Sequence, residues 1–178
     1  MSQNPPQHRP NRLKSYLETH ETVLAQLRRD GFVGEDNISL SAGSEQLLMF
    51  GEIACLGGIV IRVEKALRIL ERNGSRSLVE TDWYAYNVSV RNVANIFRYD
   101  NQDVDFTFRE GHQDRHHKHV FDWTTGDEQE VQWVGADNWP KLNQVIEEAL
   151  DWYWENRNKL PEPDKYPAIN LRNNKQEA

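Results

Sequence analysis

The sequence predicts an α+β fold, in which a mostly antiparallel β-sheet of about five to six strands carries N-terminal and C-terminal helices packed on it. Three observations lead to this prediction. Apolar residues alternate with a period of two in several segments between positions 45 and 134, which is typical of half-buried strands. Apolar residues at helical spacing occur near the two ends of the chain, and Gly- and Asn-rich turns separate the middle segments.

The first half of the chain begins with a predicted helix over residues 12–30, which Gly31 is placed to end. Residues 34–44 are rich in Gly, Asp, Asn and Ser and are expected to form a loop. Gly57-Gly58 suggests a turn before a segment, 59–69, that alternates as a long strand. Residues 63–72 also fit a short helix capped by Asn73-Gly74, but we favour the strand.

The second half continues with predicted strands over 84–90, 94–99, 119–123 and 130–134. Turns are expected at Arg91-Asn92 and at residues 124–127. A final helix follows, with Asp137 or Asn138 as its cap and Pro140 in its first turn. Its apolar stripe consists of Leu142, Val145, Ile146, Ala149, Leu150 and Tyr153.

Length and composition predict one folded domain. The chain has 178 residues, with 38% hydrophobic and 28% charged residues and six tryptophans. We expect a disordered lead over 1–11, a single domain over 12–160 and a flexible tail over 161–178. The net charge of −7 gives no support for non-specific binding of long nucleic acids, which normally needs a basic face.

No secretory signal and no membrane-spanning segment is visible, so we expect a soluble, cytoplasmic protein without membrane association. Cys55 is the only cysteine, which excludes an intrachain disulfide. Its neighbours Ala54 and Leu56 favour a small buried apolar role.

Residues 112–119, His-Gln-Asp-Arg-His-His-Lys-His, hold four of the six histidines. In an extended segment His117 and His119 would lie on one side, with His116 and Lys118 on the other. The two imidazoles could act as a general acid/base pair on a phosphodiester, with Arg115 and Lys118 stabilising the charged transition state. A solvated polar loop that happens to be rich in histidine is the alternative.

A metal site is the third interpretation of this segment. His112, His116, His117 or His119 could bind a transition metal together with a carboxylate such as Asp100, Asp103 or Asp114. No Cys-x-x-Cys or His-Glu-x-x-His spacing strengthens it, so the sequence predicts neither a metal nor another cofactor.

Two further segments precede the histidines. In Arg98-Tyr99-Asp100-Asn101, Arg98 and Asp100 point the same way on a strand and can form an ion pair, and Asp100 could orient an imidazole. In the aromatic strand around Tyr84 and Tyr86, the rings could stack on nucleic-acid bases, although core packing is the commoner use of such residues.

The order of these motifs resembles the TumE-type family of prokaryotic toxin–antitoxin toxins. The matching residues are Tyr84 and Tyr86, 96–101, 116–122, Gly126 and 139–142, within a family-like core over 46–157. The resemblance implies a small toxin that is made beside a helix-turn-helix antitoxin, which neutralises it. It implies no particular reaction.

The resulting hypothesis is a toxin that acts on RNA or a nucleotide by metal-independent acid/base chemistry. The predicted catalytic residues are His116, His117, His119 and Asp100, and the predicted substrate-binding residues are Arg98, Arg115, Lys118, Tyr84 and Tyr86. The alternative is a non-catalytic binding or scaffold protein. It would use the His-rich loop and the tryptophan-bearing C-terminal helix as interaction surfaces, including contacts between copies of the chain.

Overall fold

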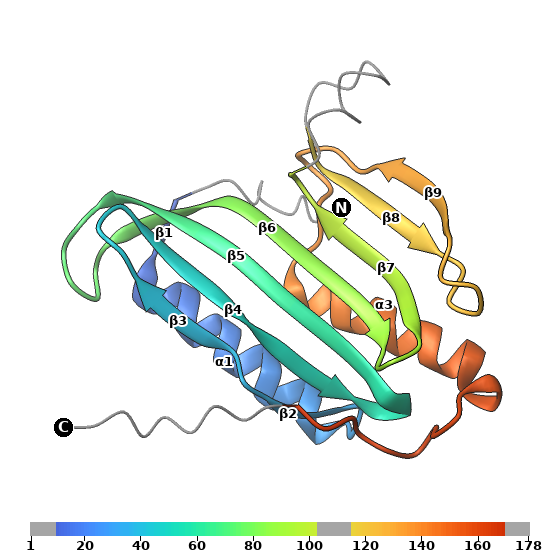
Figure 1. Ribbon diagram of the computed structural model, residues 1–178. Helices are drawn as coiled ribbons and strands as arrows, with labels where there is room; N and C mark the ends of the chain where they lie inside the picture. Colours follow the sequence, from blue (N-terminus) through green and yellow to red (C-terminus); the bar gives the residue numbers. More distant parts are fainter. Residues whose placement is uncertain (1–9, 103–114, 170–178) are drawn as a thin grey trace, which may run out of the picture.

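The computed structural model describes residues 10–102 and 115–169 (Figure 1). Within these residues, nine strands form one sheet in the order β2-β4-β5-β6-β7-β8-β9, with β1 paired to β6 and β3 paired to β4. The elements are β1 (Asn11–Arg12), α1 (Leu13–Arg29), β2 (Val33–Asp36), β3 (Ser39–Ala42), β4 (Gln46–Cys55), β5 (Ile59–Glu71), β6 (Leu78–Val90), β7 (Ala94–Asp100), β8 (His117–Phe121), β9 (Glu128–Trp133) and α3 (Leu142–Asn156).

The predicted α+β class with a mostly antiparallel sheet is confirmed, since each pairing between these strands is antiparallel. The predicted number of five to six strands is wrong. The expected loop over 34–44 contains most of β2 and all of β3, which pair with opposite halves of β4. These are short strands, and β3 is largely exposed, so no apolar alternation marks it in the sequence.

The centre of the sheet is the long hairpin of β5 and β6. The predicted strand over 59–69 is confirmed and the helical alternative is wrong, because Ile61, Val63 and Leu67 are buried at alternate positions that continue the β pattern. The turn predicted at Arg91-Asn92 is also present, and Asn92 adopts the left-handed backbone conformation there, with φ +59°.

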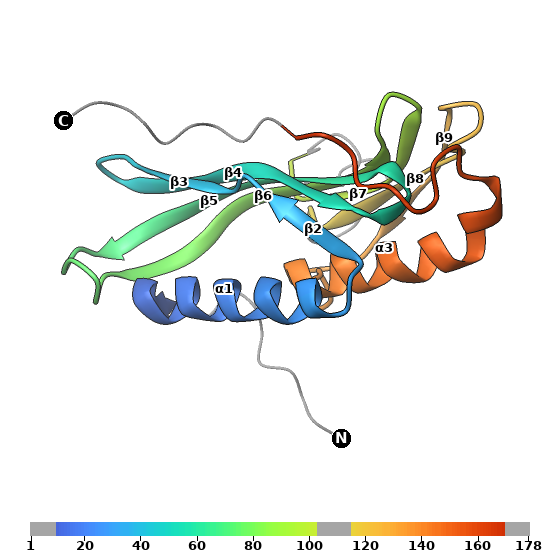
Figure 2. The ribbon, with the colours of Figure 1, turned by 90° about the horizontal axis from the view of Figure 1, so that it is seen from below.

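Both helices lie along the same face of the sheet (Figure 2). The main core forms between them and that face, where Leu24 of α1 and Val145, Ile146 and Tyr153 of α3 are buried. Burial of each large apolar side chain contributes about 1.5–3 kcal/mol. Neither helix has the length and apolar composition of a membrane span among the residues that the structure describes.

Helix α3 begins later than predicted. Its N-cap is Lys141 rather than Asp137 or Asn138, and the Lys141 backbone N–H donates a 2.9 Å hydrogen bond to the Gln144 side chain. Pro140 therefore precedes the helix. The reason is Trp139, which is buried and stacks on Tyr84 with ring centroids 4.4 Å apart, so the preceding segment packs on the sheet.

The chain after α3 returns towards β2. The Gly58 N–H donates to the Lys165 carbonyl at 3.1 Å, and the Tyr166 hydroxyl donates to the Gly31 carbonyl. The predicted tail over 161–178 therefore begins with a segment that contacts the folded domain. Residues 170–178, like 1–9 and 103–114, lie outside the described part of the chain.

Candidate functional site

The pairing of β7 with β8 assembles the candidate site. Asp100 lies opposite His117 and Arg98 lies opposite His119 in the antiparallel register. Because strand side chains alternate, these four residues share one face, while Tyr99 and Lys118 point to the other, where they contact Glu148 of α3. The candidate site is therefore on the face opposite the helices.

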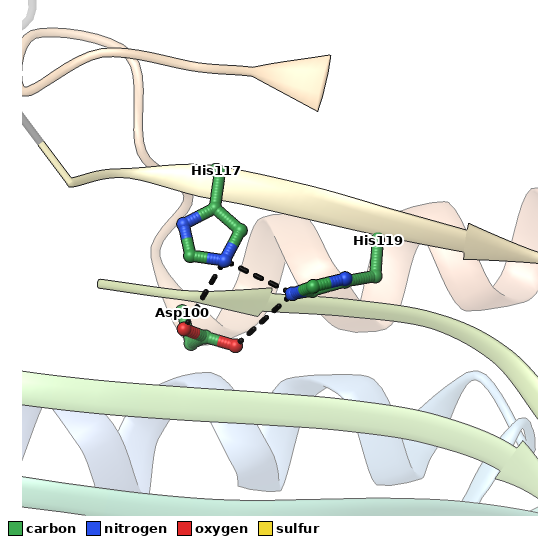
Figure 3. A group of neighbouring side chains, drawn as sticks. All are labelled: Asp100, His117 and His119. Carbon is green, nitrogen blue, oxygen red and sulfur yellow. Dashed lines mark hydrogen bonds and ion pairs between the residues drawn. The ribbon is translucent and has the colours of Figure 1, made fainter. Parts of the chain in front are cut away.

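Figure 3 shows Asp100, His117 and His119 converging on one point. The two Nε2 atoms of His117 and His119 are 2.9 Å apart. His117 Nε2 lies 3.4 Å from Oδ1 of Asp100, and His119 Nε2 lies 3.8 Å from Oδ2. The side chains of Asp100 and His117 are 2% and 0% exposed and that of His119 is 15% exposed, so the cluster is reached from the His119 side.

The other nitrogen of each ring determines its tautomer. His117 Nδ1 lies 2.7 Å from the carbonyl oxygen of Arg115, which can only accept, so Nδ1 carries the proton. His119 Nδ1 lies 2.7 Å from the carboxylate of Glu128 and donates in the same way. In the neutral rings, both Nε2 atoms then carry lone pairs and face a carboxylate. Three electron-pair donors therefore point at one place.

The carboxylate of Asp100 is held on two sides. Its Oδ1 accepts a 2.9 Å hydrogen bond from the backbone N–H of Gln102. Its Oδ2 lies 2.7 Å from Nε of Arg98, in an ion pair that does not reach hydrogen-bond geometry. The ion pair predicted for Arg98 and Asp100 is thus confirmed, and the Arg98 side chain, 39% exposed, borders the cluster.

The donor set suits a divalent transition metal. The ligand atoms of Asp100, His117 and His119 all lie within 4.8 Å of one another. Imidazole nitrogen with carboxylate oxygen is a donor set that zinc, iron, nickel and copper accept, and three protein ligands leave a position open for a substrate. Hydrogen bonds from the distal ring nitrogens to a carboxylate and a carbonyl are the usual support of metal-binding histidines.

Four of the residues predicted to act at the site lie elsewhere. His116 is buried, shares a 3.0 Å hydrogen bond with the Tyr84 hydroxyl and stacks on Trp139. Tyr84 and Tyr86 are 0% and 2% exposed and belong to the core beneath the sheet, so neither ring is available to stack on a base. These three side chains therefore lie outside the Asp100–His117–His119 cluster.

Lys118 is the fourth. Its ammonium group pairs with Glu148 and lies over the rings of Phe97 and Tyr99, which joins β8 to α3 on the helix-covered face. An ammonium in this position cannot reach a phosphate beside His119. Arg115 is exposed, and its backbone carbonyl orients His117. His112, Asp103 and Asp114, named as alternative metal ligands, lie outside the described residues.

Glu128 is a site residue that the sequence does not predict. It belongs to β9, which pairs with β8, and its side chain is 45% exposed beside His119. The signal was present in the turn over 124–127, because a hairpin at that turn brings the start of β9 next to the end of β8. The pairing of β8 with β9 has an irregular register, with a shift between Val120 and Phe121, and the turn residues do not predict that shift.

Fold and site together define an α+β protein with a two-histidine, one-carboxylate cluster on the helix-free face of an antiparallel sheet. No known family model, curated protein or solved structure matches the chain. The resemblance to TumE-type toxins therefore stays a prediction.

Proposed function

We propose that Asp100, His117 and His119 bind a divalent transition metal and form the active centre of an enzyme that cleaves a phosphodiester in RNA or a nucleotide. The observation that carries the proposal is the convergence of two Nε2 lone pairs and a carboxylate, with both tautomers fixed by Glu128 and the Arg115 carbonyl. A cation relieves the mutual repulsion of these three donors. The sequence alone predicts no metal, because it contains no recognised metal-binding spacing.

The neighbouring charges favour an anionic substrate. The Arg98 guanidinium lies at the edge of the cluster and retains an exposed surface, which suits it to bind a phosphate oxygen. A metal held by Asp100, His117 and His119 would supply the Lewis acid that activates water and polarises an oxygen of the substrate. The protein's part is to hold the two imidazoles as Nε2 donors and to place the phosphate beside them.

The first experiment measures metal content and cleavage in one preparation. Protein purified without a histidine tag is loaded with Zn²⁺ or Mn²⁺, dialysed, analysed for metal and incubated with a structured RNA. We expect one metal ion per chain and cleavage that a chelator abolishes. The variants Asp100→Asn and His117→Ala/His119→Ala should lose both the bound metal and the cleavage of RNA. The control variant His20→Gln, which removes an imidazole on α1, should retain the metal and the cleavage.

A second mechanism is supported by the 2.9 Å separation of the two Nε2 atoms, which also fits a proton shared between the rings. In that case His117 and His119 exchange a proton with the substrate, and Asp100 stabilises the charged pair, without any metal. The same assay separates the two mechanisms. Cleavage by a metal-free preparation, undiminished by a chelator and lost in His119→Ala, would support the proton-sharing pair.

The proposed biological role is that of a toxin with a helix-turn-helix antitoxin as its partner, and it is supported by the sequence resemblance alone. Induced expression in a bacterial host tests it. Growth should stop with the wild type and continue with Asp100→Asn. Normal growth with both, and no cleavage in vitro, would favour a binding protein, for which the exposed Trp154 of α3 and Trp133 of β9 offer contact surfaces.

A further inference from the structure

A second site lies on the other face of the sheet, between α1, β5, β6 and the start of α3. It is a cavity of about 490 Å³, within the range of small-molecule sites. Its lining includes Tyr16, His20, Lys65, Tyr86 and Trp139. None of these residues contributes to the Asp100–His117–His119 cluster, which the strand alternation places on the opposite face.

The unusual feature of this cavity is a buried cation. Lys65 is only 7% exposed, and its ammonium lies 5.1 Å from the ring centroid of Tyr16 and 5.3 Å from that of Trp139. It also contacts the hydroxyl of Tyr86. Among the described residues, no carboxylate lies within ion-pair distance of it, although buried lysines are almost always paired.

The acidic residue that lines the same cavity is already engaged. Glu80 of β6 forms an ion pair with Arg68, which lies opposite it on β5. The same cavity is lined by a second polar group, the imidazole of His20. Its Nε2 atom is buried and has no hydrogen-bond partner in the described part of the chain. Burial lowers the pKa of His20, the nearby charge of Lys65 lowers it further, and the carboxylate of Asp36 partly opposes both effects.

We propose that this cavity binds an organic carboxylate with an apolar body, such as a medium-chain fatty acid. The carboxylate of the ligand forms the ion pair that Lys65 lacks, and it accepts a hydrogen bond from the Nε2–H of His20. Its apolar body occupies the rest of the space, against Tyr16 and Leu67. Charge complementarity decides the class of ligand, because a neutral or cationic molecule of the same shape leaves the ammonium uncompensated.

Titration calorimetry of the full chain with decanoate tests the proposal, with decanol as the matched neutral ligand. We expect saturable binding of decanoate and at least tenfold weaker binding of decanol. Lys65→Met should weaken decanoate binding by about 10- to 100-fold and leave decanol unaffected. Lys14→Met, which removes an exposed lysine of α1 outside the cavity, is the control and should bind decanoate like the wild type.

The Lys65→Met variant is expected to fold, since replacing an unpaired buried charge by an apolar side chain of similar length is neutral or stabilising. An unfolding curve measured beside each titration confirms this. Equal affinity for decanoate and decanol, unchanged decanoate binding in a folded Lys65→Met variant, or no saturable binding by the wild type would each overturn the proposal. The result is independent of the metal centre, because Asp100→Asn should bind decanoate normally.

Discussion

Metal binding by Asp100, His117 and His119 predicts a measurable gain in stability. A zinc ion with bonds of about 2.0 Å places neighbouring ligand atoms of a tetrahedral site about 3.3 Å apart. The two Nε2 atoms are 2.9 Å apart and lie 3.4 and 3.8 Å from different oxygens of Asp100, and one ligand atom of each residue lies within 4.8 Å of the others, so rotation of the side chains is enough to close the site around a metal. Little rearrangement of the strands is therefore needed, and binding should add its free energy to that of the folded state.

The expected gain in the free energy of unfolding can be calculated from the linkage between metal binding and folding. A metal present at about 100 times its dissociation constant stabilises the folded state by about 2.7 kcal/mol. For a chain of 178 residues each kcal/mol raises Tm by about 2–4 °C, so the expected rise is about 5–11 °C. Differential scanning calorimetry with and without Zn²⁺ measures it, and a chelator should reverse it.

The variants decide whether the gain comes from this cluster. Asp100→Asn and His119→Ala should each reduce the Zn²⁺-induced rise to under about 2 °C, because the remaining donors bind the metal far more weakly. Mg²⁺, which prefers oxygen ligands, should have little effect on the wild type. An equal rise in the wild type and both variants would show that zinc binds elsewhere, and a wild type without any rise would rule out a metal site at this cluster.

Three further predictions concern the neighbours of the site and the core. Glu128→Gln should weaken metal binding by about 10- to 100-fold in a competition titration with a chromophoric chelator, since its carboxylate orients His119; an unchanged affinity would contradict this. Gly57→Ala should reduce the free energy of unfolding in urea by about 2–4 kcal/mol, because Gly57 has φ +78° and an added Cβ would lie 2.7 Å from a Leu160 methyl. Gly74→Ala, at φ +52° with open space around it, should lose only about 1 kcal/mol, and equal losses would refute the packing argument. Burial raises the pKa of the Cys55 thiol, so above its ordinary value of about 8.5 the unfolded state binds fewer protons and stability falls by up to about 1.4 kcal/mol per pH unit. Urea unfolding from pH 8 to pH 10 should show a shallower fall for Cys55→Ala, and parallel curves would contradict the assignment.

Much of the central fold could be predicted because burial on one face leaves a period of two in the sequence. The strand over 59–69 and the turn at Asn92 follow from that alternation and from ordinary turn chemistry. Strands β2 and β3 could not be predicted in this way. They are short edge strands, with few buried side chains, and pairing with β4 rather than apolar pattern defines them.

The site was predicted in part for the same reason. Alternation placed His117 and His119 on one side and paired Arg98 with Asp100, and both predictions are confirmed. The sequence also placed Lys118 on the other side, but could not show that α3 covers that face and brings Glu148 to it. The sequence alone did not predict that Asp100 lies opposite His117, because this register is set by the pairing of β7 with β8 and not by the local pattern of either strand.

Nitrogen-15 NMR of the imidazole rings in the zinc-loaded protein can establish whether both histidines bind the metal through Nε2, because it reports which ring nitrogen carries the proton. We expect a proton on Nδ1 and the chemical shift of a metal-bound nitrogen on Nε2 for both His117 and His119. A proton on Nε2 of either ring in the presence of saturating Zn²⁺ would contradict the metal centre.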